Sequence, residues 1–534
     1  MGRGYRKEYN VLCGECKVDN KDILMKKRAL ISVSDKTGIV DFARKLVGLG
    51  FDIISTGGTY KQLKENGLPI MKVSDVTGFP EIMNGRVKTL HPAIHSGILA
   101  DKNNPEHMEA LKEHNITPID LVVVNLYPFR KTIGSPNVTE AEVIEQIDIG
   151  GPTMVRAAAK NFHSVVIVVD QNDYDIVLQE LKHAGEISMD MKRKLAKKAF
   201  QHTAEYDSYI SNYFSTICGE ELPSQISISL PLQQKLRYGE NPHQEAAYYD
   251  EKPLITQLHG KELSFNNFQD IDAALKLIYD FQEIPTVAIL KHCNPCGIGT
   301  ANTLKEAYRK AFATDTQSPF GGIVISNRAL DMDAALEINK IFTEIIITPE
   351  FPPEVLDRLM KKKNRRLITF ERESLDSLIN TYNVRSCMKG LLLQKEDIAQ
   401  DNEENWQVVT DRKPTDIEME KLRFAWKTVH HLKSNAIAIC KEDRTIGLGM
   451  GQPSRIDATE IALSKAKKSG LSVKDCALGS DAFFPFRDSI DFIANEGITC
   501  VIQPGGSVRD DEVIQACDEH SITMIFTGVR HFKH

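Results

Sequence analysis

The chain has 534 residues and a mass of 59.9 kDa, too large for a single hydrophobic core, so we expect two to four domains. Its formal net charge of −7 argues against a general nucleic-acid binder, whose affinity rests on a basic face. No apolar run approaches the roughly 18 residues of a membrane span. The basic start at residues 1–7 lacks the apolar core of a secretory signal.

The ten cysteines are scattered, and several, such as Cys440 and Cys500, lie in apolar runs. This usage favours buried thiols in a reducing cytoplasm over a disulfide framework. Two Cys-x-x-Cys pairs exist, Cys13/Cys16 and Cys293/Cys296, but they lie far apart, whereas a zinc ribbon brings its pairs within about 15–20 residues. We therefore expect no structural zinc. A weak alternative is that residues 1–27 bind zinc or nucleic acid.

The first half alternates strands and helices, beginning after a polar extension at residues 1–27. A strand at 28–33 leads through the turn 34–38 into a helix from Ile39. A second strand at 51–54 leads through the Gly-rich turn 56–59 into a helix at 60–66. Strands at 121–126 and 165–169, a helix at 152–161 and a mainly helical stretch at 173–218 follow. Strand–turn–helix repeats predict a parallel sheet with its site at the strand C-terminal ends.

The Pro- and Ser-rich stretch 223–231 predicts a domain boundary. After it a faint internal duplication appears. One copy runs from Thr286 through residues 321–326 to 345–347, and the other from residues 435–440 through 500–502 to 522–526. Between the copies, the basic run 361–366 is typical of a solvated surface loop.

Several segments of the first half could bind phosphate. The turns 34–38 and 56–59 offer backbone N–H groups in front of helix N-termini, although neither matches a Walker A or dinucleotide motif. The segment 84–95 brings together Arg86, Lys88, His91 and His95, which suits a phosphate but equally a solvated basic loop. Lys160 follows Arg156 by one helical turn among small residues, either facing a ligand or on an exposed helix face.

In the second half, the apolar strand 286–290 ends in Lys291 and His292, and Asn294, Pro295 and Gly297 predict a turn after them. A lysine beside an imidazole suits a general base with a cation that stabilises an oxyanion. The alternative is a strand end that reaches solvent. The Gly-rich stretch 447–455 resembles a phosphate turn. The aromatics of 480–488 suit a flat heterocycle or an ordinary core.

Ten motifs together carry a specific resemblance: SVSDKTG, STGGT, GRVKTLHP, QIDIGG, RAAAKN, RYGENPHQ, KHCNPCG, GQPSRID, SDAFFPFRD and RHFKH. In this order they resemble the bifunctional AICAR formyltransferase/IMP cyclohydrolase family from Arg28 to His534. The resemblance implies an α/β protein: a methylglyoxal-synthase-like parallel-sheet domain at 28–222, a linker at 223–231 and a transformylase at 232–534. The transformylase would contain two cytidine-deaminase-like units, about 232–366 and 367–534. Deaminase zinc is not expected, because Gly299 stands where the zinc motif needs a cysteine.

The resemblance also implies site residues. His292 would be the general base on the 5-amino group of AICAR, Lys291 would support formyl transfer, and Lys160 would exchange protons in ring closure. AICAR would contact Arg237, Tyr238, Gly321, Glu344, Asn435, Arg455 and Arg530. The folate would contact Ile456, Phe483, Asp488 and Ser507. IMP or FAICAR would contact Ser34, Asp35, Lys36, Thr56, Gly57, Gly58, Thr59, Arg86, Lys88, Thr89, Asn125, Asp148 and Ile149. Glu344 departs from the Asp of some members, which keeps the charge but changes its reach.

The implied function is the last two steps of IMP synthesis in the cytoplasm by a homodimer. Formyl transfer from the co-substrate 10-formyltetrahydrofolate to AICAR gives FAICAR, and dehydrative ring closure gives IMP, with no metal or redox cofactor and no nucleic-acid or membrane partner. The alternative is a non-catalytic nucleotide sensor that uses the first domain as an effector module. The Lys291–His292 pair and Lys160 favour the enzyme.

Overall fold

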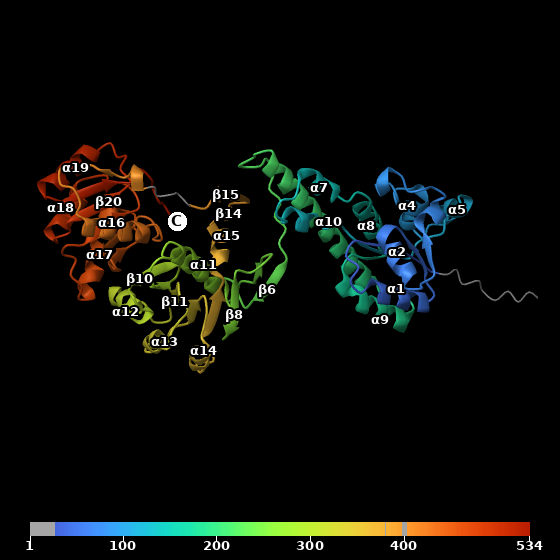
Figure 1. Ribbon diagram of the computed structural model, residues 1–534, viewed down its shortest axis with the longest axis horizontal. Coiled ribbons are helices and arrows are strands. Elements are labelled where there is room, and N and C mark those ends of the chain that lie inside the picture. Colours follow the sequence, from blue (N-terminus) through green and yellow to red (C-terminus); the bar gives the residue numbers. More distant parts are fainter. Residues whose placement is uncertain (1–26, 380, 398–402) are drawn as a thin grey trace, which may run out of the picture. The chain divides into compact units, whose positions relative to one another are not determined.

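The computed structural model describes residues 27–379, 381–397 and 403–534 (Figure 1). The chain divides into two compact units, one ending at Ser229 and the other beginning at Leu230. This division falls within the stretch 223–231 that we expected to be a linker. Of the expected extension 1–27, only Lys27 belongs to the described residues, so Cys13 and Cys16 lie outside them.

The first unit contains a sheet of five parallel strands in the order β3-β2-β1-β4-β5. These strands are β1 (Arg28–Val33), β2 (Asp52–Ser55), β3 (Ile70–Lys72), β4 (Leu121–Asn125) and β5 (Val166–Val168). The helices are α1 (Ile39–Gly48), α2 (Gly57–Glu65), α3 (Val73–Thr77), α4 (Pro92–Leu99), α5 (Pro105–Glu113), α6 (Phe129–Ile133), α7 (Glu140–Glu145), α8 (Gly150–Lys160), α9 (Tyr174–Ala184) and α10 (Met189–Ile217). The predicted parallel sheet is therefore confirmed.

The strand order explains where this unit can hold a ligand. The chain builds β2 and β3 on one side of β1 and then returns to add β4 and β5 on the other side. Such a reversal opens a crevice at the carboxyl ends of the two central strands, here β1 and β4. Both strands are almost wholly buried, as expected for a parallel sheet covered on both faces.

Two helices begin earlier than the sequence indicated. The helix predicted from Tyr60 begins at Gly57, and the helix predicted from Pro152 begins at Gly150. Glycines have low helix propensity, so their pattern suggested turns. In the structure both Gly-Gly pairs form the first helical turn, where backbone N–H groups lack partners within the helix. These pairs are therefore placed to meet a ligand.

The second unit is built around a 12-stranded sheet in the order β16-β21-β20-β19-β17-β18-β10-β9-β11-β12-β13-β8. Its strands are β8 (Ile255–His259), β9 (Thr286–Lys291), β10 (Asn294–Thr300), β11 (Ile323–Ser326), β12 (Ile345–Thr348), β13 (Arg366–Phe370), β16 (Gln407–Val408), β17 (Ile437–Lys441), β18 (Arg444–Gly449), β19 (Ala477–Ser480), β20 (Cys500–Gln503) and β21 (Thr523–Phe526). Two-stranded sheets pair β6 (Leu232–Leu236) with β7 (Ala246–Tyr249), and β14 (Tyr382–Cys387) with β15 (Gly390–Lys395). The helices are α11 (Phe265–Tyr279), α12 (Leu304–Thr314), α13 (Met332–Ile338), α14 (Pro353–Met360), α15 (Leu375–Ile379), α16 (Asp416–Val429), α17 (Arg455–Lys468), α18 (Asp488–Asn495) and α19 (Asp510–Glu519).

The duplication is clearer in the structure than in the sequence. The first repeat runs α11-β9-β10-α12-β11-α13-β12-α14-β13, and the second runs α16-β17-β18-α17-β19-α18-β20-α19-β21. The two repeats have the same strand order and the same strand directions. The expected division near residue 366 falls on the first residue of β13, which completes the first repeat. The sequence comparison also missed β10, β18 and β19, because glycines interrupt their apolar pattern.

Those glycines have equivalent packing roles in the two repeats. A Cβ atom on Gly299 of β10 would overlap the carbonyl of Ala307 in α12, and one on Gly449 of β18 would overlap the carbonyl of Ala458 in α17. The stretch 447–455 contains the end of β18, a connection at 450–454 and the start of α17 at Arg455. Its first glycines belong to a strand that lies directly against its crossover helix, and close approach of two backbones requires glycine.

Candidate functional site

The first unit encloses a cavity of about 490 Å³ at the carboxyl ends of β1, β2 and β4. Nearly all residues predicted to contact IMP or FAICAR line it: Ser34, Lys36, Thr56, Gly57, Gly58, Thr59, Arg86, Lys88, Thr89, Asn125, Asp148 and Ile149. Asp35 does not line it. Its carboxylate accepts hydrogen bonds from the backbone (3.0 Å) and hydroxyl (2.7 Å) of Thr37 and so closes its own turn.

One end of the cavity is suited to an anion. The N-terminal turn of α2 faces it, and a Cβ atom on Gly57 would lie 3.2 Å from Nζ of Lys88. A Cβ atom on Gly58 would lie 3.4 Å from Cε of Lys36. Two ammonium groups therefore approach a helix N-terminus whose N–H groups and dipole favour negative charge. The absence of a side chain on either glycine leaves these groups accessible.

Two polar side chains hold the loops around this end. The Asn125 Oδ1 atom accepts from the backbone N–H groups of Ser34 (2.6 Å) and Asp35 (3.0 Å), and its amide donates to the Asp35 carbonyl (2.9 Å). The buried Thr59 hydroxyl accepts from the backbone of Val33 (3.0 Å) and donates to its carbonyl (2.9 Å). Asn125 and Thr59 thus tie β4 and α2 to the end of β1.

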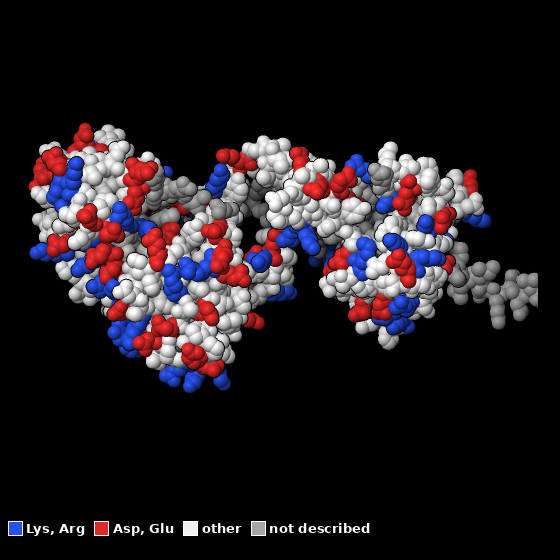
Figure 2. All heavy atoms as spheres, in the orientation of Figure 1, with Lys and Arg blue, Asp and Glu red and all other residues white. Residues whose placement is uncertain are grey.

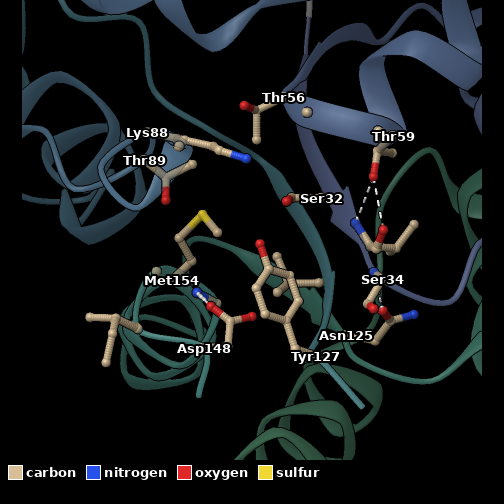
Figure 3. A pocket seen from close by; sticks show the side chains of 18 of the residues that line it. Ser32, Ser34, Thr56, Thr59, Lys88, Thr89, Asn125, Tyr127, Asp148 and Met154 are labelled. Carbon is tan, nitrogen blue, oxygen red and sulfur yellow. Dashed lines mark hydrogen bonds between the residues drawn. The ribbon is translucent and has the colours of Figure 1, made fainter. Parts of the chain in front are cut away.

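Lys88, Tyr127 and Asp148 surround the middle of the cavity. Figure 3 shows the Lys88 side chain entering from one side, with Tyr127 and Asp148 side by side across from it. Burial raises the pKa of Asp148, and hydrogen bonds such as that from the Gly151 backbone (2.8 Å) offset part of this rise. Burial and then the Asp148 charge raise the pKa of Tyr127. An ammonium group, a phenol and a buried carboxyl, the last two with raised pKa values, therefore share one cavity.

Contacts with Gly151 of α8 and Tyr206 of α10 fix the position of Asp148. A Cβ atom on Gly151 would overlap its carboxylate, so α8 must begin with a glycine there. The Asp148 backbone N–H donates to the buried Tyr206 hydroxyl (2.9 Å), which donates to the Gln146 carbonyl (2.5 Å). Tyr206 on α10 therefore positions the loop that carries Asp148.

In the second unit, the predicted residues gather because of the junction between the repeats. β10 pairs antiparallel with β18, so the strands of the two repeats run in opposite directions across one continuous sheet. The N-terminal ends of β10, β11, β12 and β13 therefore lie on the same edge as the C-terminal ends of β18, β19, β20 and β21. On this edge lie Lys291, His292, Gly321, Glu344, Asn435, Arg455, Ile456, Phe483, Asp488, Ser507 and Arg530.

Lys291 and His292 lie at a tight β-hairpin between β9 and β10 rather than before an irregular turn. Lys291 pairs with Asn294, which leaves His292 (φ 54°) and Cys293 (φ 62°) as the two tip residues. Positive φ at both central positions matches the twist of a two-residue hairpin, but it is strained for side chains with a Cβ. The exposed His292 imidazole is thus presented on a constrained tip.

Neighbouring elements support this tip. The Cys293 backbone N–H donates to Asp270 Oδ1 (2.6 Å) of α11, and the Lys291 ammonium donates to the Phe320 carbonyl (3.0 Å) beside Gly321. Burial raises the pKa of Asp270, and the Cys293 hydrogen bonds offset part of the rise; the charges of Asp270 and His292 also interact. Asp270 thus holds the backbone of the hairpin tip that carries His292.

Glu344 and Arg455 are both paired within the protein. The Glu344 carboxylate accepts from Arg366 (2.7 Å) and Asn267 (3.3 Å). The buried Arg455 donates to Asp481 (2.5 Å) and to the side-chain oxygen of Asn435 (2.8 Å). Arg237, by contrast, is exposed and stacks over the Tyr238 ring at 4.7 Å, and Arg530 is exposed and stacks over Phe532 at 4.4 Å. The two exposed guanidinium groups are the better suited to a ligand phosphate.

Comparison with known proteins identifies the family of the chain. Residues 158–465 match the family described as AICARFT/IMPCHase bienzyme, and residues 38–153 match the MGS-like domain. The chain is 51% identical over 517 residues to the Bifunctional purine biosynthesis protein PurH of Bacillus cytotoxicus, which covers 96% of this chain and all of that protein. The protein of the same name in Bacillus cereus strain B4264 shows the same identity and coverage. The chain belongs to the AICARFT/IMPCHase bienzyme family.

A solved structure titled "Crystal structure of ForH" is 35% identical and covers 36% of this chain and 99% of that one. Its TM-score of 0.33 supports no comparison of folds.

In this bienzyme Lys160 does not line the cavity of its own chain. It is exposed at the C-terminal end of α8, whereas Gly150 and Gly151 at the other end form the cavity wall. Ten residues of helix separate these ends by about 15 Å. The motif RAAAKN indicated a nearby functional lysine, but the axis of α8 carries it away from Asp148.

Sequence reasoning also missed residues that the fold brings to these sites. Tyr127 follows β4 by two positions, and a polar residue just after a central strand could have been considered. Asp270 had no local signal, because its partner Cys293 is 23 residues away. The segment 84–95 is partly helical: His91 is the N-cap of α4 and accepts from the Ala93 backbone (3.1 Å), and His95 lies within that helix.

The remaining expectations concern cysteines, membranes and charge. The described cysteines are free thiols, and burial raises the pKa of Cys293 to about 11 and of Cys296 to about 12, so both are protonated at neutral pH. Within the described part of the chain, no helix is long and apolar enough to cross a bilayer. On the face seen in Figure 2, acidic and basic side chains are interspersed over each unit, unlike a continuous basic nucleic-acid surface.

Proposed function

We propose that this chain catalyses the last two steps of IMP synthesis. In the first step, the 5-amino group of AICAR takes the formyl group from 10-formyltetrahydrofolate. In the second, the product FAICAR closes its ring with loss of water. The observation that carries the proposal is full-length similarity to bifunctional relatives in a chain that has a separate equipped site in each unit.

Formyl transfer is assigned to the sheet edge of the second unit. The amine nitrogen attacks the formyl carbon, His292 accepts a proton from the nitrogen, and the folate nitrogen leaves with a proton. The AICAR amine is conjugated with its ring carboxamide and is a weak nucleophile, so removing its proton during attack lowers the barrier. Lys291 lies next to the base and supports negative charge on the formyl oxygen.

The substrates of this step would bind along the same edge. Arg237, Tyr238, Gly321, Glu344, Asn435, Arg455 and Arg530 form the proposed AICAR set, and Ile456, Phe483, Asp488 and Ser507 the proposed folate set. Since Arg455 is buried against Asp481, we assign it to hold Asn435, and we assign phosphate binding to the exposed arginines. The folate is a co-substrate, and neither step exchanges electrons with an external carrier.

Ring closure is assigned to the cavity of the first unit. The carboxamide nitrogen attacks the formyl carbon, and the resulting hydroxyl group leaves as water. Lys88 and the protonated Tyr127 can stabilise the developing oxyanion, and Asp148, with its raised pKa, can transfer the proton. The phosphate would bind at the α2 N-terminus with Lys36.

We assign Lys160 to ring closure only in the cavity of a second copy of the chain. Its position at the far end of α8 removes it from the cavity in its own unit. We retain the prediction that it exchanges protons in ring closure, and we propose that it does so in the cavity of a partner within a homodimer. A cytoplasmic location is consistent with the free, mostly buried thiols.

The deciding experiment supplies purified full-length protein with AICAR and 10-formyltetrahydrofolate and, separately, with FAICAR. Substrates and products are then separated, and we expect to find IMP in both reactions. Tight binding of AICAR and FAICAR with no turnover would instead support the nucleotide-sensor alternative. Conversion of FAICAR to IMP without formyl transfer would support the assignment of ring closure to the first unit. It would contradict the assignment of formyl transfer to the second unit.

A further inference from the structure

Outside both proposed sites, three imidazoles and two carboxylates form a cluster in the second unit. Asp280 follows α11, His430 and His431 follow α16, and Asp397 and His531 complete the group. The Asp280 Oδ2 atom lies 2.7 Å from Nε2 of His431 and 3.3 Å from Nδ1 of His430. The cluster therefore joins the end of the first helix of one repeat to the end of the equivalent helix of the other.

The first three of these residues have the donor set of a transition-metal site. One ligand atom each from Asp280, His430 and His431 lies within 4.8 Å of the others. Imidazole nitrogen and carboxylate oxygen bind zinc at about 2.0–2.2 Å, so a small opening of the Asp280–His431 contact would admit an ion. His431 is only 5% exposed, so its imidazole is held in the interior of the unit rather than in solvent.

The contacts of Asp397 and His531 also agree with a metal site. The second ring nitrogen of His430, Nε2, faces the Asp397 carboxylate at 3.6 Å, and that carboxylate lies 2.8 Å from Nδ1 of His531. Metal-binding histidines generally donate their other N–H group to a carboxylate, which fixes the ring orientation and the tautomer. Asp397 is placed to do this for His430.

We propose that Asp280, His430 and His431 bind a divalent transition metal of the zinc class, with Asp397 orienting His430. The site is structural: a bound ion would link α11, which carries Asp270 beneath the His292 hairpin, to α16 of the second repeat. The proposal is independent of the assigned reactions and of the expectation that neither reaction needs a metal. Three protein ligands leave the fourth tetrahedral position to water.

The test uses full-length protein in which Cys13 and Cys16 are changed to serine, so that this N-terminal pair cannot bind metal. The protein is treated with a chelator, which is then removed, and titrated with Zn²⁺ and with Co²⁺. Bound metal is counted by elemental mass spectrometry, and Co²⁺ coordination is followed by its visible absorption. We expect one ion per chain, tetrahedral Co²⁺ bands and an unfolding midpoint that rises with metal.

Matched variants locate the site. His430→Gln should lose stoichiometric binding, and Asp397→Asn should weaken it by about 10–100-fold, as outer-shell substitutions do. His520→Gln is the control: His520 also contacts an aspartate, Asp491, at 2.8 Å, but outside the cluster. Absence of stoichiometric metal in the parent protein, or equal binding by His430→Gln and His520→Gln, would overturn the proposal. In either case the cluster is a metal-free hydrogen-bonded network.

Discussion

The two repeats of the second unit share their strand order, their helix positions and a matching pair of strand glycines, yet their first hairpins carry different residues. The β9–β10 tip presents His292 and Cys293 with positive φ, supported by Asp270. At the equivalent β17–β18 tip, Asp443 pairs with Lys310 of the first repeat (2.5 Å), and its carbonyl accepts from the Thr300 backbone (2.8 Å). One hairpin tip carries the proposed chemistry, and the other fastens the repeats together.

The first unit shows a different way to build a site. Its cavity lies at the switch point of a parallel sheet and is lined by residues of a single unit. The second unit instead combines two repeats along one edge. This comparison can be tested at several positions.

The largest effect is expected from a substitution at the β9–β10 tip, with a substitution at the equivalent β17–β18 tip as its control. His292→Ala should lower the rate of formyl transfer by about 10²–10⁴-fold, the usual contribution of a positioned general base. Glu442→Ala, an exposed change at the equivalent tip, should leave the rate within about twofold, since surface changes rarely matter. Steady-state formyl transfer and FAICAR closure are measured for both. Loss of ring closure in folded His292→Ala would contradict the two-site assignment.

In the first unit, Lys160→Ala and Asp148→Asn should each lower ring closure by about 100-fold or more while formyl transfer persists. If Lys160 acts in the partner's cavity, mixing the two inactive variants should restore activity. Random exchange makes half of the dimers hybrid, each with one intact site, so about a quarter of the wild-type rate should return. A mixture that stays inactive after demonstrated exchange would rule out this arrangement.

The paired glycines should respond alike. Gly299→Ala and Gly449→Ala each force a methyl group into a helix carbonyl, and overpacking of this kind costs about 1–3 kcal/mol of unfolding free energy. Gly390→Ala in β15 is the control, because the nearest atom to its Cβ would be 3.9 Å away. Denaturant unfolding measures all three. A clear difference between Gly299→Ala and Gly449→Ala would show that the repeats pack differently.

The smallest effect concerns the capping residues of the first helix in each repeat. α11 is capped by Ser264 with neutral Asn267, whereas α16 is capped by Thr415 with Glu418. Burial opposes ionisation of Glu418, but bonds from Arg412 and Thr415 outweigh it and lower its pKa from 4.5 to about 2. A lowered folded-state pKa stabilises the protein above pH 4.5, and this contribution is lost as pH falls towards 2.

Glu418→Gln should therefore cost about 1–3 kcal/mol at neutral pH and progressively less in acid. Glu420→Gln removes a more exposed partner of Arg423 and should cost less than about 1 kcal/mol at every pH. Unfolding free energies across a pH series test this. An effect of Glu418→Gln that stays constant with pH would disagree with the ionisation argument.

Much of the fold was predictable because apolar runs and glycine positions are local signals. The strands predicted at 28–33 and 121–126, the second of which ends at Asn125 in the structure, were evident from spacing, as were the buried face of α1 and the parallel sheet. Strands with internal glycine, such as β10 and β18, were not, because the residues that require those glycines lie on separate helices.

The sequence by itself determined the family and the adjacent positions of Lys291 and His292, because these depend on which residues occur and in what order. The tertiary structure alone decided that β10 and β18 pair antiparallel, which brings residues up to about 240 positions apart to one edge. It also decided that Tyr127 and Asp270 join the sites while Lys160 points away from its own cavity. The distance between two residues of a site depends on the directions of strands and helices, and no single sequence motif specifies these directions.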